Sequence, residues 1–161
     1  MRRCIVLFAK KPEAGKVKTR LESACTPSEA ARLYRAFLLD TATVISAAQA
    51  EEKVIAYTPR EAEDSLRDIL CEAGSFIYVA QCDGSLGERM QNAIESALGR
   101  GAECVVLLGS DSPDVPVEYV NQHCVDTSLV ELNAHFDGCS KLPAFTQSDL
   151  TAALKIATAG K

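Results

Sequence analysis

The sequence lacks any apolar run near the roughly 20 residues that a helix needs to cross a bilayer. Its N-terminal apolar stretch, Cys4–Ala9, is too short for the apolar core of a signal peptide, and two lysines follow at once. We therefore expect a cytoplasmic protein with no membrane partner, in which this stretch is a buried strand.

Paired cysteines and an excess of positive charge are also missing. The seven cysteines are odd in number and form no CxxC pair, which argues against a zinc site or a disulfide framework. The net charge of −5 argues against general nucleic-acid binding. No internal repeat, low-complexity tract or linker interrupts the 161 residues, a length that suits one domain.

What the chain does contain is a repeated switch between strand-like and helix-like apolar periods. Strands are expected at 4–9, 53–58, 76–80 and 104–108, and helices at 60–73, 86–98 and 115–124. Another helix should begin at Thr26-Pro27-Ser28-Glu29, a capping box, and continue with Leu33, Phe37, Thr41, Val44, Ile45 and Ala48 at helical spacing. After about Asp126 the pattern weakens, with a candidate strand at 128–132 and a candidate helix at 148–159.

This alternation predicts an α/β fold, a Rossmann-like three-layer sandwich with a mainly parallel central sheet. In such sheets ligands bind outside the carboxyl ends of the strands. Three loops should therefore share one edge: KKPEAGKVKTR after the first strand, QCDGSLGER after the third and GSDSPD after the fourth.

The first loop has the composition of a phosphate-binding loop. Gly15 would let backbone amides approach an anion, and the lysines and Arg20 supply positive charge and bidentate hydrogen bonds. The loop is neither a Walker motif nor GxGxxG, because Val17 stands where the Walker motif needs Ser or Thr. A merely solvated basic loop is the alternative interpretation.

The other two loops add a helix start and carboxylates. Gly84, Gly87 and Arg89 lie where a helix N-terminus could face an anion, although a plain helix start explains Gly84 and Ser85 equally well. Asp111 and Asp114 follow a buried strand, where carboxylates suit a hard divalent cation that bridges phosphates. Asp111 as a helix cap is the structural alternative.

Taken together, these stretches resemble a known family. FAKKPEAGKVKTRL, LYRAFLLDT, DGSLGERM and LLGSDSPDVP are similar to the bacterial glycosyltransferase family found in radical-SAM and selenium-associated gene neighbourhoods. The resemblance covers roughly residues 4–120. It implies the GT-A-type nucleotide-diphospho-sugar transferase fold, which that family shares with the molybdenum-cofactor and phospholactate guanylyltransferases.

The resemblance also implies roles for individual residues. Those lining the nucleotide site would be Phe8, Ala9, Lys10, Gly15, Lys18, Thr19 and Arg20, with Gly84, Gly87 and Arg89 shaping the pocket from the opposite side. Asp111 would bind Mg²⁺ or Mn²⁺. Lys18, Arg20 and Asp111 would be the catalytic residues.

The C-terminal part departs from the family pattern. Where the family has a GPAxDGGYY-like segment, this chain has Ala134-His135-Phe136-Asp137-Gly138-Cys139, and it ends early. We therefore expect one transferase-like domain, 1–161, with a core at 3–125 and a divergent segment at 126–161 in which the acceptor half of the site is altered or missing. Asp137 is a candidate second carboxylate.

The leading hypothesis is a transferase that acts on a nucleotide sugar, with an unknown acceptor. A guanylyltransferase-like nucleotidyl transfer, or a nucleotide-binding module that has lost turnover, are the alternatives. A partner-binding domain with an exposed sheet edge is a third, and self-association into a homo-oligomer stays open.

Overall fold

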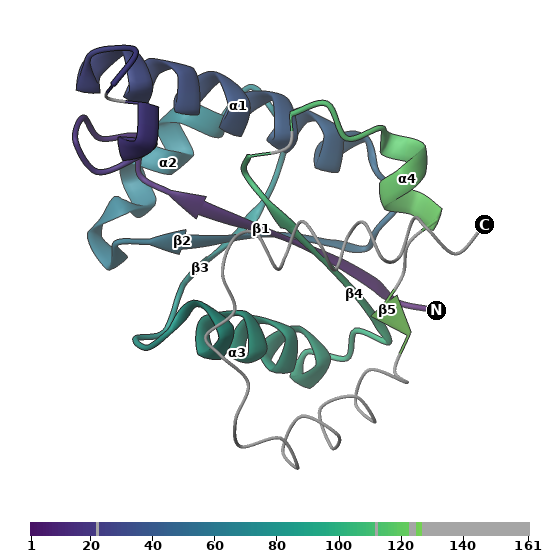
Figure 1. The fold of residues 1–161 in the computed structure, drawn as a ribbon. Coiled ribbons are helices and arrows are strands. Elements are labelled where there is room, and N and C mark those ends of the chain that lie inside the picture. The colour runs from purple at the N-terminus through teal and green to yellow at the C-terminus, as the bar shows by residue number, and fades with distance from the viewer. Residues whose placement is uncertain (22, 112, 123–124, 127–161) are drawn as a thin grey trace.

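The protein is a central β-sheet covered by helices on both faces (Figure 1). The structure is a computed structural model and describes residues 1–21, 23–111, 113–122 and 125–126. Within that part of the chain the sheet has five strands in the order β3-β2-β1-β4-β5. They are β1 (Arg3–Lys10), β2 (Glu52–Thr58), β3 (Ile77–Ala80), β4 (Cys104–Gly109) and β5 (Val125–Asp126).

The first four strands are parallel, as the alternating sequence pattern predicted. β1 pairs with β2 on one side and with β4 on the other, so it is the central strand. Its apolar run is buried on both faces, with Cys4, Ile5, Val6 and Leu7 each at most 2% exposed. β5 adds a short antiparallel strand beside β4, which the sequence pattern did not predict.

The helices match the predicted positions, with differences at their ends. They are α1 (Pro27–Ala47), α2 (Glu63–Leu70), α3 (Leu86–Gly99) and α4 (Val117–Gln122), with 3₁₀ turns η1 (Thr19–Leu21) and η2 (Arg60–Ala62). The expected helix at 60–73 is therefore η2 followed by the shorter α2. The predicted capping box at Thr26 and Glu29 is present at the start of α1.

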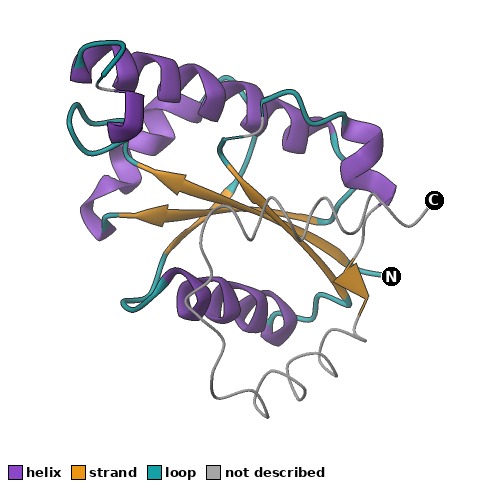
Figure 2. Ribbon diagram, viewed as in Figure 1, coloured by secondary structure: helices purple, strands orange, loops and turns teal. Residues whose placement is uncertain are grey.

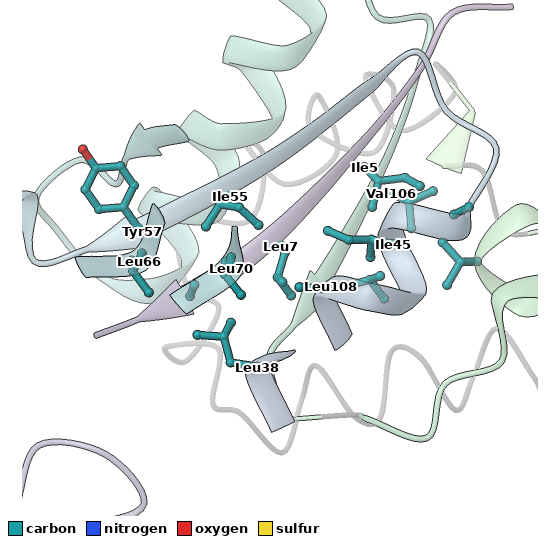
Figure 3. Packing of buried hydrophobic residues seen from close by; sticks show 14 of the residues in the cluster. Ile5, Leu7, Leu38, Ile45, Ile55, Tyr57, Leu66, Leu70, Val106 and Leu108 are labelled. Carbon is teal, nitrogen blue, oxygen red and sulfur yellow. The ribbon is translucent and has the colours of Figure 1, made fainter. Parts of the chain in front are cut away.

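Two apolar clusters join the layers. The larger one packs α1, α2 and α4 against one face of the sheet. Figure 3 shows Leu7, Leu38, Ile55 and Leu66 of this cluster, to which α4 contributes Val120. The smaller one packs Ala97 of α3 against the other face, on Cys4, Val6 and Val54. The alternation along β1 places Leu7 in one cluster and Val6 in the other, as period 2 requires.

The inward face of α1 corrects one detail of the sequence interpretation. Leu33, expected to face inward, is 41% exposed, whereas its neighbour Tyr34 is buried. The buried side chains are Ala30, Tyr34, Leu38, Thr41, Ala42 and Ile45. Thr41, Ile45 and Ala48 are buried as expected, so the difference is confined to the first of the expected positions. Tyr34 is buried there in place of Leu33 because its hydroxyl finds polar partners in the interior.

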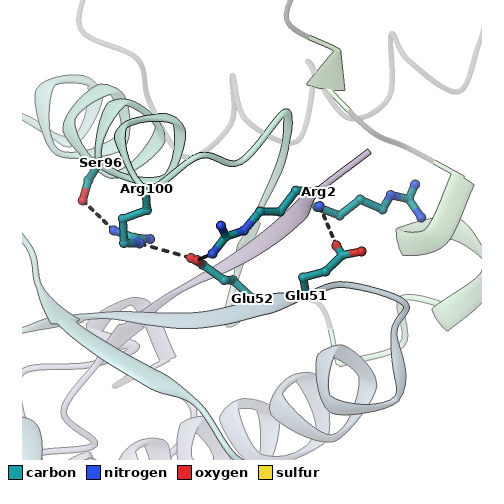
Figure 4. Close-up of polar contacts among 6 residues, drawn as sticks. Arg2, Glu51, Glu52, Ser96 and Arg100 are labelled. Atoms are coloured by element: carbon teal, nitrogen blue, oxygen red, sulfur yellow. Dashed lines mark hydrogen bonds and ion pairs between the residues drawn. The ribbon is translucent and has the colours of Figure 1, made fainter.

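A charged cluster joins the elements at the amino end of the sheet. Glu52 on β2 is bonded by Arg2 at 2.5 Å and by Arg100 at 3.1 Å, and Arg100 also donates to Ser96 of α3 (Figure 4). Glu52 is only 8% exposed, so each guanidinium offsets the cost of burying its carboxylate. The cluster fastens the N-terminus and the end of α3 to the sheet, at the edge opposite the loops considered below.

The cysteines depart in one respect from the expected pattern. Cys4, Cys25, Cys71 and Cys82 are free, but Cys104 on β4 is disulfide-bonded. An odd count and the absence of CxxC did not predict this bond, because pairing depends on which residues meet in the fold. The candidate strand at 128–132, the candidate helix at 148–159 and Asp137 lie outside the described residues.

Candidate functional site

The loops expected to form a site lie at the carboxyl edge of the sheet. Parallel strands end on the same side, and the arrows of β1 and β2 in Figure 2 point to that side. The loop after β1 is tied to β2 at once, because Lys11 donates its backbone N–H to the Thr58 carbonyl at 2.9 Å. The segments after β1, β2, β3 and β4 therefore form one continuous rim.

The loop after β1 is held in shape by its own backbone. Lys16 N–H bonds the Glu13 carbonyl at 3.0 Å, closing a turn in which Gly15 has a φ of 74°. A turn with positive φ at its third residue favours glycine, so turn geometry accounts for Gly15. Lys10 donates from Nζ to the Lys16 carbonyl at 2.7 Å, which draws the two ends of the loop together.

Lys18 and Asp111 meet across this rim. Lys18 Nζ lies 2.6 Å from Asp111 Oδ1, although one residue follows β1 and the other follows β4. Their side chains are 21% and 32% exposed, so the pair is partly shielded from water yet open to a ligand. A pair in this setting interacts more strongly than one on an open surface, because less solvent screens it.

The backbone and surroundings of Lys18 are unusual. Its φ of 52° is the only positive value of a non-glycine residue in the described chain. That conformation costs about 1 kcal/mol for a residue with a side chain, and such strain concentrates at functional positions. Lys18 Nζ also lies 5.4 Å from the centre of the Phe37 ring on α1, a distance typical of a cation–π contact.

A buried hydroxyl lies beside this pair. Tyr34 of α1 is 4% exposed, and its hydroxyl accepts the Lys10 backbone N–H at 2.8 Å. The same hydroxyl shares a 2.8 Å hydrogen bond with Ser110 Oγ, next to Asp111 in sequence. Burial raises the pKa of Tyr34, which outweighs the opposing hydrogen bonds from Ser110 and Lys10, so the hydroxyl stays protonated.

The loop after β3 leads into α3 through a second capping box. Ser85 accepts the Glu88 N–H, and the Glu88 carboxylate accepts the Ser85 N–H at 2.6 Å. Gly84 has a φ of 123°, and a Cβ there would lie 2.7 Å from Glu88 Oε2. The cap geometry therefore accounts for Gly84, as the structural alternative proposed, while leaving the helix N-terminus facing the rim.

A cavity of about 360 Å³ opens between the ends of β2 and β3. This volume falls in the range of small-molecule sites. The residues that line it come from the loops after both strands and from α3: Thr58, Pro59, Arg60, Glu61, Gln81, Cys82, Asp83, Gly84 and Arg89. Thr58 joins the cavity to the β1 loop through its bond with Lys11.

Gln81 and Arg89 form the polar wall of the cavity. The Gln81 side chain donates to the Ala56 carbonyl at 2.7 Å and accepts from Arg89 NH1 at 3.0 Å. Arg89 Nε is buried and has no hydrogen-bond partner among the residues that the structure describes. A buried donor of this kind is costly to leave unpaired.

The predicted site residues fall into four groups, and Gly15 lies in the β1 loop described above. Lys10, Lys18 and Asp111 gather at the rim, and Gly84 and Arg89 line the cavity, with Gly87 beside them in the first turn of α3. Phe8 and Ala9 pack against the two cores at the end of β1. Thr19 and Arg20 are exposed in η1, and Arg20 forms no ion pair with another described residue.

Sequence reasoning assigned no role to Tyr34, Phe37 or Gln81. Tyr34 and Phe37 lie in LYRAFLLDT, a stretch that contributed to the family resemblance, and Gln81 directly follows a predicted strand. A tyrosine within an apolar helix face was the available signal for Tyr34. Nothing in the sequence indicated that Gln81 would be buried.

The side chains at the rim could hold a metal ion only if a bound ligand supplied some of its coordinating oxygens. No cluster of three or more His, Cys, Asp or Glu side chains occurs in the described ranges. Asp111 offers one carboxylate, and the Lys18 ammonium already lies on it as a stand-in cation. Mg²⁺ is commonly held by one or two carboxylates together with substrate phosphates and water, so the residues fit a metal that arrives with a diphosphate.

Comparison with known proteins shows the family of the chain. Residues 41–132 match the model of a family described as "Uncharacterized protein conserved in bacteria (DUF2064)". The chain belongs to the DUF2064 family. No curated protein is significantly similar to it.

A solved structure extends the comparison of this DUF2064 chain. It is the crystal structure of a "putative nucleotide-diphospho-sugar transferase" from Desulfovibrio desulfuricans G20, 38% identical, with a TM-score of 0.69 over 76% of this chain. The match covers 53% of that protein, so the chain spans about half its length. The fold is thus that of a nucleotide-diphospho-sugar transferase, as predicted, while neither comparison bears on gene neighbourhood.

No helix of the DUF2064 chain, over the ranges described, is long and apolar enough to cross a membrane.

Proposed function

We propose that the protein is a transferase that binds a nucleotide sugar at the carboxyl edge of its sheet. The observation that carries the proposal is the contact between Lys18 and Asp111, at 2.6 Å, beside a cavity that can hold a small molecule. The similarity to a nucleotide-diphospho-sugar transferase supports the same chemistry.

A metal–diphosphate complex carries both signs of charge, and the Lys18–Asp111 pair presents both. On binding, Lys18 would turn to a phosphate oxygen and Asp111 to Mg²⁺ or Mn²⁺, so that neither group loses its partner. The metal would neutralise charge on the diphosphate leaving group. Lys18 and the exposed Arg20 would stabilise the remaining negative charge as the bond to the sugar breaks.

The cavity between β2 and β3 is the proposed site of the nucleoside. It is joined to the β1 loop through Thr58, so a nucleotide could extend from the cavity to Lys18. Gly84, Gly87 and Arg89 would border it. Phe8, Ala9, Lys10, Gly15 and Thr19 would shape the phosphate end of the site.

The direct test is a panel of nucleotides and nucleotide sugars measured by thermal shift, with and without Mn²⁺. We expect at least one nucleoside diphosphate or nucleotide sugar to raise the melting temperature, and more so with metal. Any ligand found is then incubated with metal, and release of nucleoside diphosphate or of diphosphate is measured. Release supports a transferase, binding without release supports a non-catalytic module, and no binding overturns the proposal.

A further inference from the structure

The hydroxyl of Tyr34 accepts a hydrogen bond from a β1 backbone N–H that lies beyond the end of the β1–β4 pairing. The pairing of β1 with β4 ends at Phe8 and Gly109. Lys11 N–H points to β2, where it bonds Thr58, so the N–H of Lys10 points to the β4 side, as alternation along a strand requires. No β4 carbonyl lies opposite Lys10 in that register, and the Tyr34 hydroxyl takes its place at 2.8 Å.

The other partner of this hydroxyl belongs to β4's own extension. Ser110 is the first residue after β4, it is 6% exposed, and its Oγ lies 2.8 Å from the Tyr34 oxygen. One side chain of α1 therefore joins Lys10, the last residue of β1, to Ser110, the first residue after β4. Lys18 lies in the loop after β1, and Asp111 directly follows Ser110.

The same helix touches Lys18 one turn further on. Phe37, three residues after Tyr34, lies beneath the Lys18 ammonium. The α1 helix thus contacts both the loop after β1, through Lys18, and the segment after β4, through Ser110. Neither Tyr34 nor Phe37 has an assigned role in the proposed function, although both lie in the LYRAFLLDT stretch.

We infer that Tyr34 is a positioning residue whose hydroxyl holds the ends of β1 and β4 at the spacing that lets Lys18 and Asp111 act on one ligand. This inference rests on the proposed function, since it assigns Asp111 to the metal. It makes Tyr34 a residue that acts through its neighbours, because its buried hydroxyl is fully engaged by Lys10 and Ser110.

The test compares Tyr34→Phe with Tyr57→Phe. Tyr57 is also 4% exposed, and its hydroxyl bonds Glu63 at 2.7 Å, which makes it a matched control outside the rim. Both variants should lose roughly 2–8 °C in Tm through the missing hydrogen bond. In the wild type, Mn²⁺ should increase nucleotide affinity, and only Tyr34→Phe should lose most of that increase. Calorimetry measures it, with the nucleotide that binds tightest in the thermal-shift panel. A Tyr34→Phe protein that keeps the full gain overturns the inference.

A second readout needs no ligand. In Tyr34→Phe the Lys10 amide should exchange with deuterium at least about tenfold faster than in the wild type, while the Lys11 amide, bonded to Thr58, should be unchanged. Unchanged exchange at Lys10 overturns the inference whatever the ligand data show. If Lys10 exchanges faster in Tyr34→Phe but Mn²⁺ has no effect on nucleotide binding to the wild type, the positioning role of Tyr34 is supported and the proposed function is contradicted. If Tyr34→Phe does not fold, Ser110→Ala removes only the hydrogen-bond partner that follows β4. A Ser110→Ala protein that keeps the full Mn²⁺-dependent gain in nucleotide affinity would also contradict the inference.

Discussion

At the scale of single residues, the site depends on Lys18. Four other positive charges lie between Lys10 and Arg20, and the sequence could not rank them. The structure separates Lys18 from the rest, because it alone combines a carboxylate contact, a positive φ and an aromatic ring beneath its ammonium. Lys16, by contrast, is exposed and pairs with Glu13 within its own loop.

We expect Lys18→Met to weaken nucleotide binding by about tenfold or more, since a charge-assisted hydrogen bond to phosphate is lost. Lys16→Met is the matched control and should change affinity by less than about threefold, because an exposed pair contributes little. Isothermal titration calorimetry measures both. Equal affinities for the two variants would show that the Lys18–Asp111 contact only fastens the loop.

Some residues of the site could be predicted from the sequence and others could not. Asp111 and Lys18 could be proposed in advance, because buried parallel strands bring the loops that follow them to one edge. Tyr34 could not, since its role depends on which face of α1 is buried, and apolar spacing favoured Leu33. Gln81 and the cavity depend on side-chain contacts between β2, β3 and α3, which no local pattern records.

At the scale of elements, the helix starts divide into structural and functional ones. Thr26 and Ser85 head identical capping boxes on α1 and α3. The Thr26 box was predicted from the sequence, whereas at Ser85 only a helix start was expected, although a capping box is a local pattern in both places. Only the α3 box lies beside the cavity, where Gly84 and Arg89 flank it.

Thr26→Ala and Ser85→Ala should each lower the free energy of unfolding by about 1 kcal/mol, the usual effect of removing a cap. Ser85→Ala should also weaken nucleotide binding, because fraying of the first turn of α3 moves Arg89 and the helix N-terminus. Urea unfolding and calorimetry separate the two effects. An unchanged affinity in Ser85→Ala would mean that α3 does not contribute to the nucleotide site.

At the scale of the whole molecule, the two edges of the sheet have different roles. The carboxyl edge carries the rim and the cavity, and the amino edge carries the Glu52 cluster (Figure 4). The parallel sheet and the burial of β1 follow from apolar periodicity and the order of elements, which is why they could be predicted. The short antiparallel β5 depends on its pairing with β4, which no local pattern records, and so could not be predicted.

The amino edge should account for part of the acid sensitivity of the fold. Burial alone would raise the pKa of Glu52, but hydrogen bonds and charge from Arg100 and Arg2 outweigh it and lower the pKa. The stabilisation is therefore complete above the unfolded-state pKa, about 4.3, and is lost as pH falls through the lower folded-state value. Glu52→Gln should cost about 1–3 kcal/mol at pH 7 and progressively less in acid.

Urea unfolding from pH 7 to pH 3 measures this difference between wild type and variant. Glu103→Gln is the control, because Glu103 is exposed and, among the described residues, its carboxylate pairs with Met1 and Arg2 at the N-terminus. A difference between wild type and Glu52→Gln that stays constant across the whole range would contradict the assigned role of the carboxylate charge.

The metal dependence of nucleotide binding tests the central claim most directly. Calorimetry is run on wild type and Asp111→Asn with the tightest-binding nucleotide or nucleotide sugar, with Mn²⁺ or with chelator. The account predicts that Mn²⁺ tightens binding to the wild type and has no such effect on Asp111→Asn, whose metal-free affinity stays close to that of the wild type. A wild-type affinity that is the same with Mn²⁺ and with chelator would contradict it.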